Sequence, residues 1–401
     1  MSLAHAHEEF NKTFPQIQIS LSKFCELRPQ NVKLFTEEIQ YSFKCVYCEN
    51  AKFLFNAIAP FIADFRNSLD DVMFKFCCDK ENYPCISGEC PICRDHKDTL
   101  IGILQVDCMD KVVTYQEWRK NGGYTEKITE HAATVRDVVE KIISGLKRLK
   151  MHIYLKKIQQ QFFYDIKHTQ SPKSATMVVD FAENYSVKGQ NEVQSSYFGR
   201  KQISVFTCVS WIGQEQHESF AIINDNIQHS KEQVYFYLKL IISELQKEYD
   251  LENLVIFSDG ASSQFKNRFS LSTVMFSKRD FNLDMEWHFF CTSHGKSSAD
   301  GIGAVVKRGV YQRVLLDKCS VYTAKKFVEC CKTFCNKINV FEVKQDDVIE
   351  QTRAIKERWN HISRIDGSRD AHCFKPSLLF GSIICAKSSL MDDPVEIGIF
   401  N

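Results

Sequence analysis

Short apolar runs alternate with helical patterns between residues 174 and 320. Runs rich in β-branched and aromatic residues predict strands at 177–181, 202–212, 218–223, 253–260 and 285–292. A helix with its N-cap at Ser230 is expected after the third run, because apolar residues from Val234 to Leu245 recur about one helical turn apart. Another helix is expected to begin near Asp300, after the last run.

The order of these elements predicts the fold class. Three strands in succession, followed by strands separated by helices, favour an α/β fold with an RNase H-like mixed sheet and flanking helices. In such a sheet the first three strands form an antiparallel meander, and the later strands are added in parallel by crossover helices. We expect this core over residues 174–320 and a helical C-terminal region over residues 321–401.

Residues 111–173 are predicted to form a helical arm before the core. Thr134 is the expected N-cap of a helix whose apolar residues begin at Val135, and the pattern continues through His152 to Leu155. We interpret His152 as a surface or packing residue. The basic residues of the arm form either a solvated helix face or a track for DNA; they are Lys147, Arg148, Lys150, Lys156 and Lys157.

Residues 1–110 contain a cysteine-rich region that is predicted to bind structural Zn²⁺. Two C-x₂-C pairs are separated by about forty residues, and such pairs supply thiolates to tetrahedral zinc. The preferred ligand set is Cys45, Cys48, Cys90 and Cys93. A local alternative is Cys78, Cys85, Cys90 and Cys93. A third interpretation is a set of ordinary buried cysteines.

Composition limits the function classes. The formal net charge of the 401 residues is +1, so any contact with DNA must come from local basic patches rather than from the whole chain. The 17 cysteines are an odd number, and no secretory leader precedes them, which favours an intracellular, reducing location. No stretch is apolar enough over 18 residues to span a membrane.

Acidic residues at the ends of predicted strands are the candidate chemistry. Asp180 is expected to end one buried strand and Asp259 another, and a carboxylate at such a place is costly unless a metal or another partner neutralises it. Asp300, at the start of the last helix, is the preferred third acid, and Glu183 is its rival. Three such acids would bind Mg²⁺ or Mn²⁺ ions for phosphoryl-transfer chemistry.

Several motifs resemble those of DDE-type cut-and-paste transposases and transposase-derived proteins of animal genomes. They are Asp180-Phe-Ala-Glu-Asn-Tyr-Ser, Glu192-Val-Gln-Ser-Ser-Tyr, Ser258-Asp-Gly-Ala-Ser-Ser-Gln-Phe-Lys-Asn and His294-Gly-Lys with Asp300-Gly-Ile-Gly, within a similarity from about residue 21 to about residue 380. The resemblance implies that Asp180, Asp259 and Asp300 are the catalytic acids. It further implies that His294, Lys296, Gln264, Lys266 and Asn267 contact the substrate.

The resemblance implies DNA strand cleavage and transfer by two-metal-ion catalysis, with DNA as partner, assembly as a homodimer or larger, and a nuclear location. Two departures favour a different hypothesis. Ala304 stands where such elements usually have glycine, and no DNA-binding finger is recognisable before residue 21. The alternative is therefore a domesticated, catalytically inactive descendant that binds DNA or protein.

Overall fold

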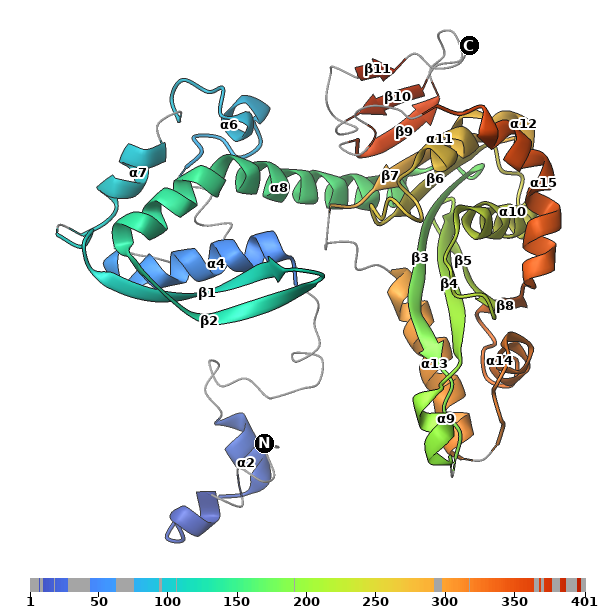
Figure 1. Ribbon diagram of the computed structural model, residues 1–401, viewed down its shortest axis with the longest axis horizontal. Helices are drawn as coiled ribbons and strands as arrows, with labels where there is room; N and C mark the ends of the chain where they lie inside the picture. The colour runs from blue at the N-terminus through green and yellow to red at the C-terminus, as the bar shows by residue number, and fades with distance from the viewer. Residues whose placement is uncertain are drawn as a thin grey trace.

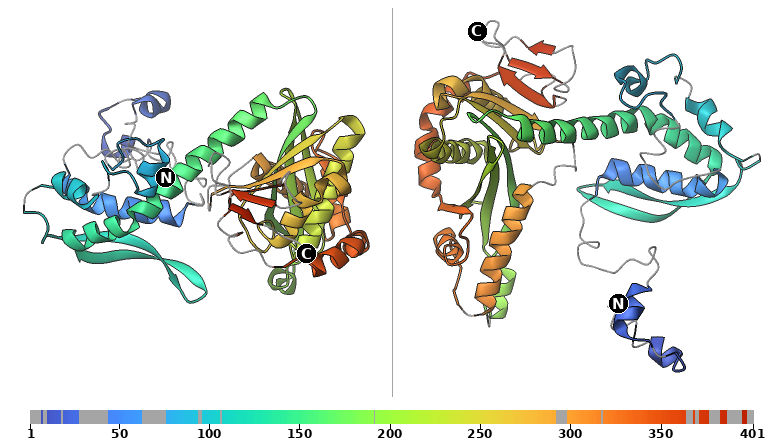
Figure 2. Two further views of the ribbon diagram at one scale, coloured as in Figure 1. Left: turned by 90° about the horizontal axis from the view of Figure 1, so that it is seen from above. Right: turned by 180° about the vertical axis from the view of Figure 1, so that it is seen from behind.

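The computed structural model describes residues 44–62 and 76–363, with gaps at 94–95, 106, 191, 292–297 and 317, together with residues 7, 10–17, 19–27, 368, 371–376, 383–386 and 395–397. A long helix, α8 (Val135–Thr169), runs from an N-terminal module into a core built on a sheet (Figure 1, Figure 2). Among the helices of these residues, none combines the length and the hydropathy of a membrane span.

The core contains a nine-stranded mixed sheet in the order β11-β10-β9-β7-β6-β3-β4-β5-β8. Its five central strands are β3 (Ser174–Ser186), β4 (Gln202–Ile212), β5 (Gln216–Asn224), β6 (Asn253–Ser258) and β7 (Asp284–Phe289). β3, β4 and β5 form an antiparallel meander, and β6 and β7 are added in parallel beside β3. The predicted strands, the meander and the parallel additions are confirmed.

Helices cover both faces of this sheet. On one face lie α10 (Lys231–Glu248), α11 (Arg268–Met275), α12 (Ser277–Phe281) and α15 (Gln345–Asn360). On the other lie the second half of α8, α13 (Ser298–Leu315) and α14 (Ala324–Cys331), while α9 (Gln194–Phe198) lies in the connection from β3 to β4. Ser230 caps α10 and exchanges hydrogen bonds with Gln233, which confirms the predicted N-cap.

The N-terminal module packs around the first half of α8. Its elements are α4 (Val46–Ile58), the 3₁₀ helix η1 (Ala59–Phe61), α6 (Tyr83–Ser87), α7 (His96–Gly102), β1 (Val112–Asn121) and β2 (Tyr124–Thr134). Helix α2 (Leu21–Glu26) precedes this module in the chain. The prediction of a helical arm from residue 111 is therefore wrong for 112–134, which form a hairpin. Gly122, with a φ of 58°, permits its tight turn. The helix begins only after Thr134, the predicted N-cap.

The C-terminal region is only partly helical, contrary to expectation. It contains α14 and α15, but it also adds the strands β8 (Asn339–Glu342), β9 (Cys373–Pro376), β10 (Ile383–Ala386) and β11 (Val395–Ile397) to the sheet. β8 pairs with β5, and β9 pairs with β7. These strands have four residues or fewer, so they are too short to show the alternation that identifies a strand in sequence.

Candidate functional site

Asp180 and Asp259 lie at equivalent positions of neighbouring parallel strands. β3 and β6 are in register up to the pair of Val178 with Phe257, and the same register carried two residues further sets Asp180 beside Asp259. Neighbouring strands lie about 4.8 Å apart. Asp259 directly follows β6, as predicted. Asp180 lies in the middle of β3 rather than at its end, because the strand continues to Ser186.

Helix α13 brings Asp300 to the same place. Ala299, the residue before it, is fully buried in the cluster formed by β3 and β6. Just over one turn further on, the backbone of Gly303 touches β3 so closely that a Cβ there would lie 2.7 Å from the Cβ of Ala182. Asp300 lies between these two contacts, in the first turn of the helix, over the face of the sheet that carries Asp180.

The three carboxylates influence one another electrostatically. Burial, followed by the negative charges of Asp259 and Asp300, raises the pKa of Asp180 to about 7, and the backbone N–H of Phe181 offsets only part of the shift. Burial also raises the pKa of Asp259, and the charge of Asp300 adds to the shift against a hydrogen bond from the backbone N–H of Ala261. At neutral pH Asp180 therefore needs a positive partner to be fully ionised.

The donor set fits a divalent metal ion. In the described part of the chain no Lys, Arg or His forms an ion pair with Asp180 or Asp259. Carboxylate oxygens are the ligands that Mg²⁺ and Mn²⁺ prefer. The carboxylate oxygens of the three acids do not all lie within 4.8 Å of one another. Two metal ions roughly 3.5–4 Å apart do not require this, because an acid that binds one ion need not contact the others.

The rival acid, Glu183, lies on β3 beside Lys307 of α13. Its side chain is exposed, and its backbone carbonyl accepts a hydrogen bond of 2.8 Å from Lys307 Nζ. A β-bulge between Ala182 and Tyr185 interrupts the alternation of β3 at this point. The charges that raise the pKa of Asp180 are those of Asp259 and Asp300. The arrangement favours Asp300 over Glu183 as the third acid.

The residues expected to contact the substrate have different surroundings. Asn267 caps α11, and its side chain also donates to the carbonyls of Ser262 and Gln264, so capping occupies its donors and acceptor. Gln264 Nε2 lies 3.4 Å from His229 Nδ1. The ammonium of Lys266 lies 5.7 Å from the ring centre of Phe289. His294 and Lys296 lie outside the described residues.

Comparison with family models covers this whole site. Residues 159–389, more than half of the chain, match the model described as "Domain of unknown function (DUF8701)". The chain belongs to the DUF8701 family. Residues 1–36 match a second model, "Domain of unknown function (DUF8699)". No curated protein matches this DUF8701 chain.

The solved structures similar to the DUF8701 chain include the human cytomegalovirus terminase nuclease domain soaked with Mn, at 11% identity and a TM-score of 0.20. The match covers 52% of this chain and 86% of that one. The same viral domain without soaking matches at 13% identity and a TM-score of 0.19, over the same shares of the two chains. TM-scores this low support no inference, so the description of the fold rests on the strand order.

Within the described part of the DUF8701 chain, the two C-x₂-C pairs belong to separate groups rather than to one shared ligand set. Cys90 and Cys93 gather with Cys78 and Cys85, as in the local alternative. Cys45 and Cys48 gather instead with His152. The preferred set is wrong because the first pair lies at the start of α4 and the second in the loop that follows α6.

The four-cysteine group has the dimensions of a tetrahedral thiolate site. Cys78 Sγ lies 3.3 Å from Cys85 Sγ and 3.6 Å from Cys90 Sγ, and all four sulfurs lie within 4.8 Å of one another. Ligands at about 2.3 Å from zinc are separated by about 3.8 Å. Backbone N–H groups of Cys93 and Ile92 lower the pKa of Cys90 to about 6, which favours its thiolate.

A buried lysine accompanies this group. Lys150 of α8 is fully buried, and its Nζ donates a hydrogen bond of 2.7 Å to the carbonyl of Cys85. Its positive charge partly offsets the effect of burial on the pKa of Cys77. A buried ammonium is costly without negative charge nearby, and thiolates bound to a metal would supply that charge. Lys150 is therefore not part of a solvated helix face.

The close contact at Gly303 leads to a testable expectation. In Gly303→Val the new side chain would overlap Ala182 and push α13 away from β3, at a cost of about 1–3 kcal/mol. Asp300 would move with the helix, so Mn²⁺ should raise the melting temperature less than in the wild type. Gly301→Ala is the matched control, because a Cβ at Gly301 meets no atom within 4 Å. An unchanged response to Mn²⁺ in Gly303→Val would contradict this role of α13.

Proposed function

We propose that this chain is a metal-dependent DNA-cleaving enzyme with an RNase H-like core, and that it cleaves and transfers strands as cut-and-paste transposases do. The observation that carries the proposal is the register of β3 with β6, which aligns Asp180 with Asp259. Two further features support it. The strand order β5-β4-β3-β6-β7 is the one expected for an RNase H-like sheet, and α13 adds Asp300 on the same face.

The residues of the site have separate tasks in this proposal. Asp180, Asp259 and Asp300 would hold Mg²⁺ or Mn²⁺. Such ions, when bound, activate the attacking water or 3′-hydroxyl and stabilise the leaving oxygen. The backbone N–H groups of Phe181 and Ala261 orient two of the carboxylates. Beneath them, the buried cluster that contains Val178, Phe257, Phe290 and Ala299 excludes water.

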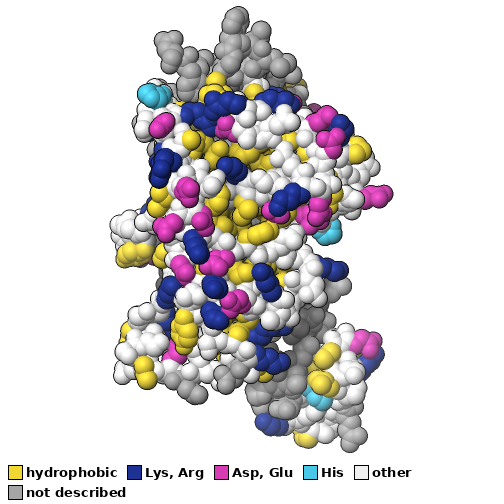
Figure 3. Space-filling view, turned by 90° about the vertical axis from the view of Figure 1, so that its right-hand side faces the viewer, with side chains coloured by type: hydrophobic (Ala, Val, Ile, Leu, Met, Phe, Trp, Pro, Cys, Tyr) yellow, Lys and Arg dark blue, Asp and Glu magenta, His cyan; other side chains and the backbone are white. Residues whose placement is uncertain are grey.

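The proposed DNA contact is local. The face of the core that is turned away from α8 carries Lys and Arg interspersed with Asp and Glu, with no extended basic patch (Figure 3). Lys307 and Arg308 lie on α13 two turns after Asp300. Burial lowers the pKa of Lys307, and the charges of Glu183 and Asp300 act against that shift. We infer that DNA approaches along α13. The nuclear location and self-assembly stay predictions from the resemblance.

We also propose that Cys78, Cys85, Cys90 and Cys93 bind a structural zinc ion. Their mutual distances, the lowered pKa of Cys90 and the buried ammonium of Lys150 support this ligand set. A closed site with four protein ligands and no open position is typical of zinc that supports a fold rather than catalysis. This zinc would hold residues 76–93 against α8.

An assay on the full-length, zinc-loaded protein tests the enzymatic proposal. Supercoiled plasmid DNA and a labelled double-stranded oligonucleotide are incubated with Mg²⁺, with Mn²⁺ or without added metal. We expect nicked plasmid only when one of these metals is added, and covalent joining of the oligonucleotide to plasmid where strand transfer occurs. DNA binding without any metal-dependent product would instead favour the catalytically inactive alternative.

A further inference from the structure

A second group of metal-binding side chains lies between α4 and α8, apart from the four cysteines. Cys45 is the N-cap of α4, Cys48 lies in its first turn, and His152 lies near the middle of α8. Cys45 Sγ is 3.3 Å from His152 Nε2, and the three ligand atoms all lie within 4.8 Å of one another. We propose that these three residues bind a second structural zinc ion, which fastens α4 to α8.

The three side chains of this group differ in kind from those of another described group, although the ring of His152 also packs on Tyr47, at 5.7 Å between centroids. In another group, which includes Glu286 and His288, the two residues alternate on β7 and so share one face of the sheet. The ring of His288 stacks on Phe257 at 5.1 Å between centroids, so core packing explains its position. Cys45 and His152 are 107 residues apart, and the fold brings their polar atoms together as it does those of His288 and Cys373. The group of Cys45 and His152 differs in that it contains two thiols of a C-x₂-C pair and a histidine, which are a preferred zinc ligand set.

The chemistry of the three side chains suits zinc. Cys45 is buried, Cys48 and His152 are half-buried, and each offers one ligand atom to the group. Thiolate sulfur and neutral imidazole are preferred zinc ligands, and zinc binding would release the protons of the cysteine thiols.

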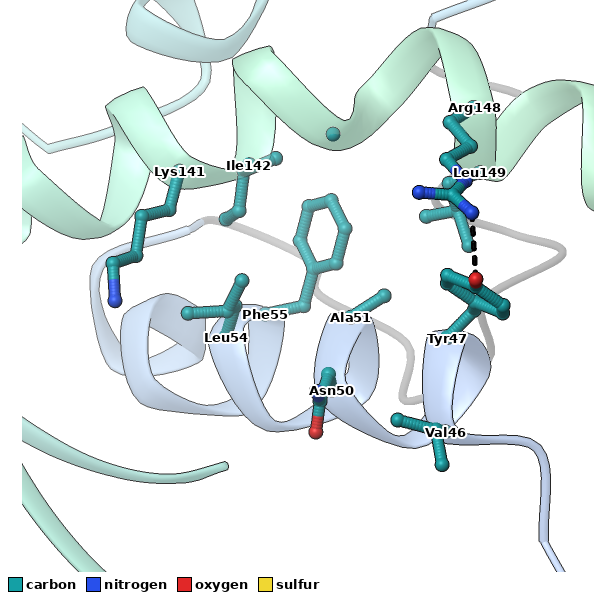
Figure 4. A pocket seen from close by; sticks show the side chains of 11 residues that line it. Val46, Tyr47, Asn50, Ala51, Leu54, Phe55, Lys141, Ile142, Arg148 and Leu149 are labelled. Atoms are coloured by element: carbon teal, nitrogen blue, oxygen red, sulfur yellow. Dashed lines mark hydrogen bonds between the residues drawn. The ribbon is translucent and has the colours of Figure 1, made fainter. Parts of the chain in front are cut away.

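The contact between α4 and α8 has an incompletely filled interior. A cavity of about 280 Å³ lies between the helices, lined mainly by apolar side chains that include Leu54, Phe55 and Ile142 (Figure 4). At its edge Arg148 donates a hydrogen bond of 2.6 Å to the hydroxyl of Tyr47. Side chains around such a space lose packing contacts, so packing holds α4 against α8 less firmly here. A metal ion bound by both helices next to it would strengthen their attachment.

The two metal groups lie on different sides of α8. Residues two apart on a helix are separated by about 200° around its axis. Lys150 reaches the four-cysteine group by its bond to the carbonyl of Cys85, and His152 reaches Cys45. The N-terminal module would therefore be fastened to α8 from two sides, by two zinc ions.

The second group also lies near the junction with the core. Gln159, two turns after His152 on the same side of α8, accepts a hydrogen bond from the backbone N–H of Cys291 and donates one to the carbonyl of Phe289. Cys291 is buried at this junction, but its sulfur is not among the ligand atoms that all lie within 4.8 Å of one another, so Cys45, Cys48 and His152 are the proposed ligands.

Zinc content measured by mass spectrometry tests this inference on the full chain. The wild type should hold two zinc ions per chain. Cys45→Ser combined with Cys48→Ser should remove one, as should Cys90→Ser combined with Cys93→Ser. His152→Gln should release one zinc at a lower chelator concentration than the wild type does, while Cys25→Ser, a thiol outside every group, should keep both. Unchanged zinc content in the Cys45 and Cys48 double variant would overturn the proposal.

X-ray absorption at the zinc edge gives a test that needs no variant of the proposed site. In the Cys90 and Cys93 double variant the remaining zinc should show two sulfur ligands together with the scattering of one imidazole. In the wild type the same histidine signal should be present at about half that amplitude per zinc. Zinc coordinated by sulfur alone in the wild type would overturn the proposal, even if the serine variants failed to fold.

Discussion

Asp180→Asn is expected to abolish metal-dependent DNA cleavage and, at the same time, to stabilise the protein at neutral pH in the absence of Mg²⁺ and Mn²⁺. Metal ions contribute several kcal/mol of transition-state stabilisation in such sites, so the loss should reach about 10³-fold or more. The gain in stability has a separate cause. Asn removes a charge whose pKa in the folded chain is raised to about 7 by burial and by Asp259 and Asp300.

The pH dependence follows from the direction of this shift. An acid whose pKa is higher in the folded than in the unfolded chain binds its proton more tightly when folded. Its contribution to stability is therefore complete below about pH 4 and is lost as the pH rises through about 7. The melting temperature of the zinc-loaded, Mg²⁺-free protein should fall more steeply between about pH 5 and about pH 8 in the wild type than in Asp180→Asn.

Added metal should reverse the order of stability of the wild type and Asp180→Asn. Mn²⁺ binds the folded wild type and should raise its melting temperature, whereas Asp180→Asn should respond little. Glu183→Gln is the matched control, because Glu183 is an exposed acid of the same strand. It should keep both cleavage and the response to Mn²⁺. Cleavage that survives in Asp180→Asn, or is lost in Glu183→Gln while Asp300→Asn retains it, would show that the assignment of the acids is wrong.

The central sheet was predictable because its strands are long and apolar on both faces. The runs at 202–212 and 253–260 each correspond to a strand, and the turn after Ser258 ends β6 where the sequence indicates. The pairing of Asp180 with Asp259 depends on a register between two strands more than seventy residues apart. Sequence periodicity contains no such register, so the order of the acids was predictable and their alignment was not.

The hairpin of β1 and β2 was missed in the sequence for a different reason. Gly122 and Gly123 are a clear turn signal between segments that alternate, but the strong helical pattern after Thr134 hides them.

The prediction of the metal-ligand groups from the sequence is limited in another way. C-x₂-C pairs indicate metal binding, but which pairs meet is decided by how α4 and α6 pack on α8. His152 in turn fits the helical period of α8, so nothing in its spacing marks it as a ligand.

Cys85→Ser combined with Cys90→Ser is expected to release the zinc of the four-cysteine group and to unfold residues 76–93 while the core stays folded. α6 has five residues, and a helix this short is unstable in water without tertiary support. Zinc binding contributes about 10–16 kcal/mol in small zinc-dependent folds. Limited proteolysis should therefore cut the double variant within this segment and leave a resistant core fragment that contains β3 to β7.

Lys150 makes this expectation sharper. Without the metal-bound thiolates the buried ammonium of Lys150 loses negative charge that would stabilise it. Lys150→Met should therefore partly restore stability in the serine variant, while in the wild type it should weaken zinc binding. Opposite effects of Lys150→Met in the wild type and in the serine variant are expected only if the ammonium and the metal-bound thiolates interact.

Cys108→Ser is the appropriate control, since Cys108 is equally buried in the N-terminal module but belongs to neither ligand group. It should keep its zinc and the proteolytic pattern of the wild type. Wild-type zinc content in the serine variant would contradict the ligand set. Destabilisation by Lys150→Met in both backgrounds would instead show that Lys150 serves packing and the hydrogen bond to Cys85 alone, with no electrostatic coupling to a metal.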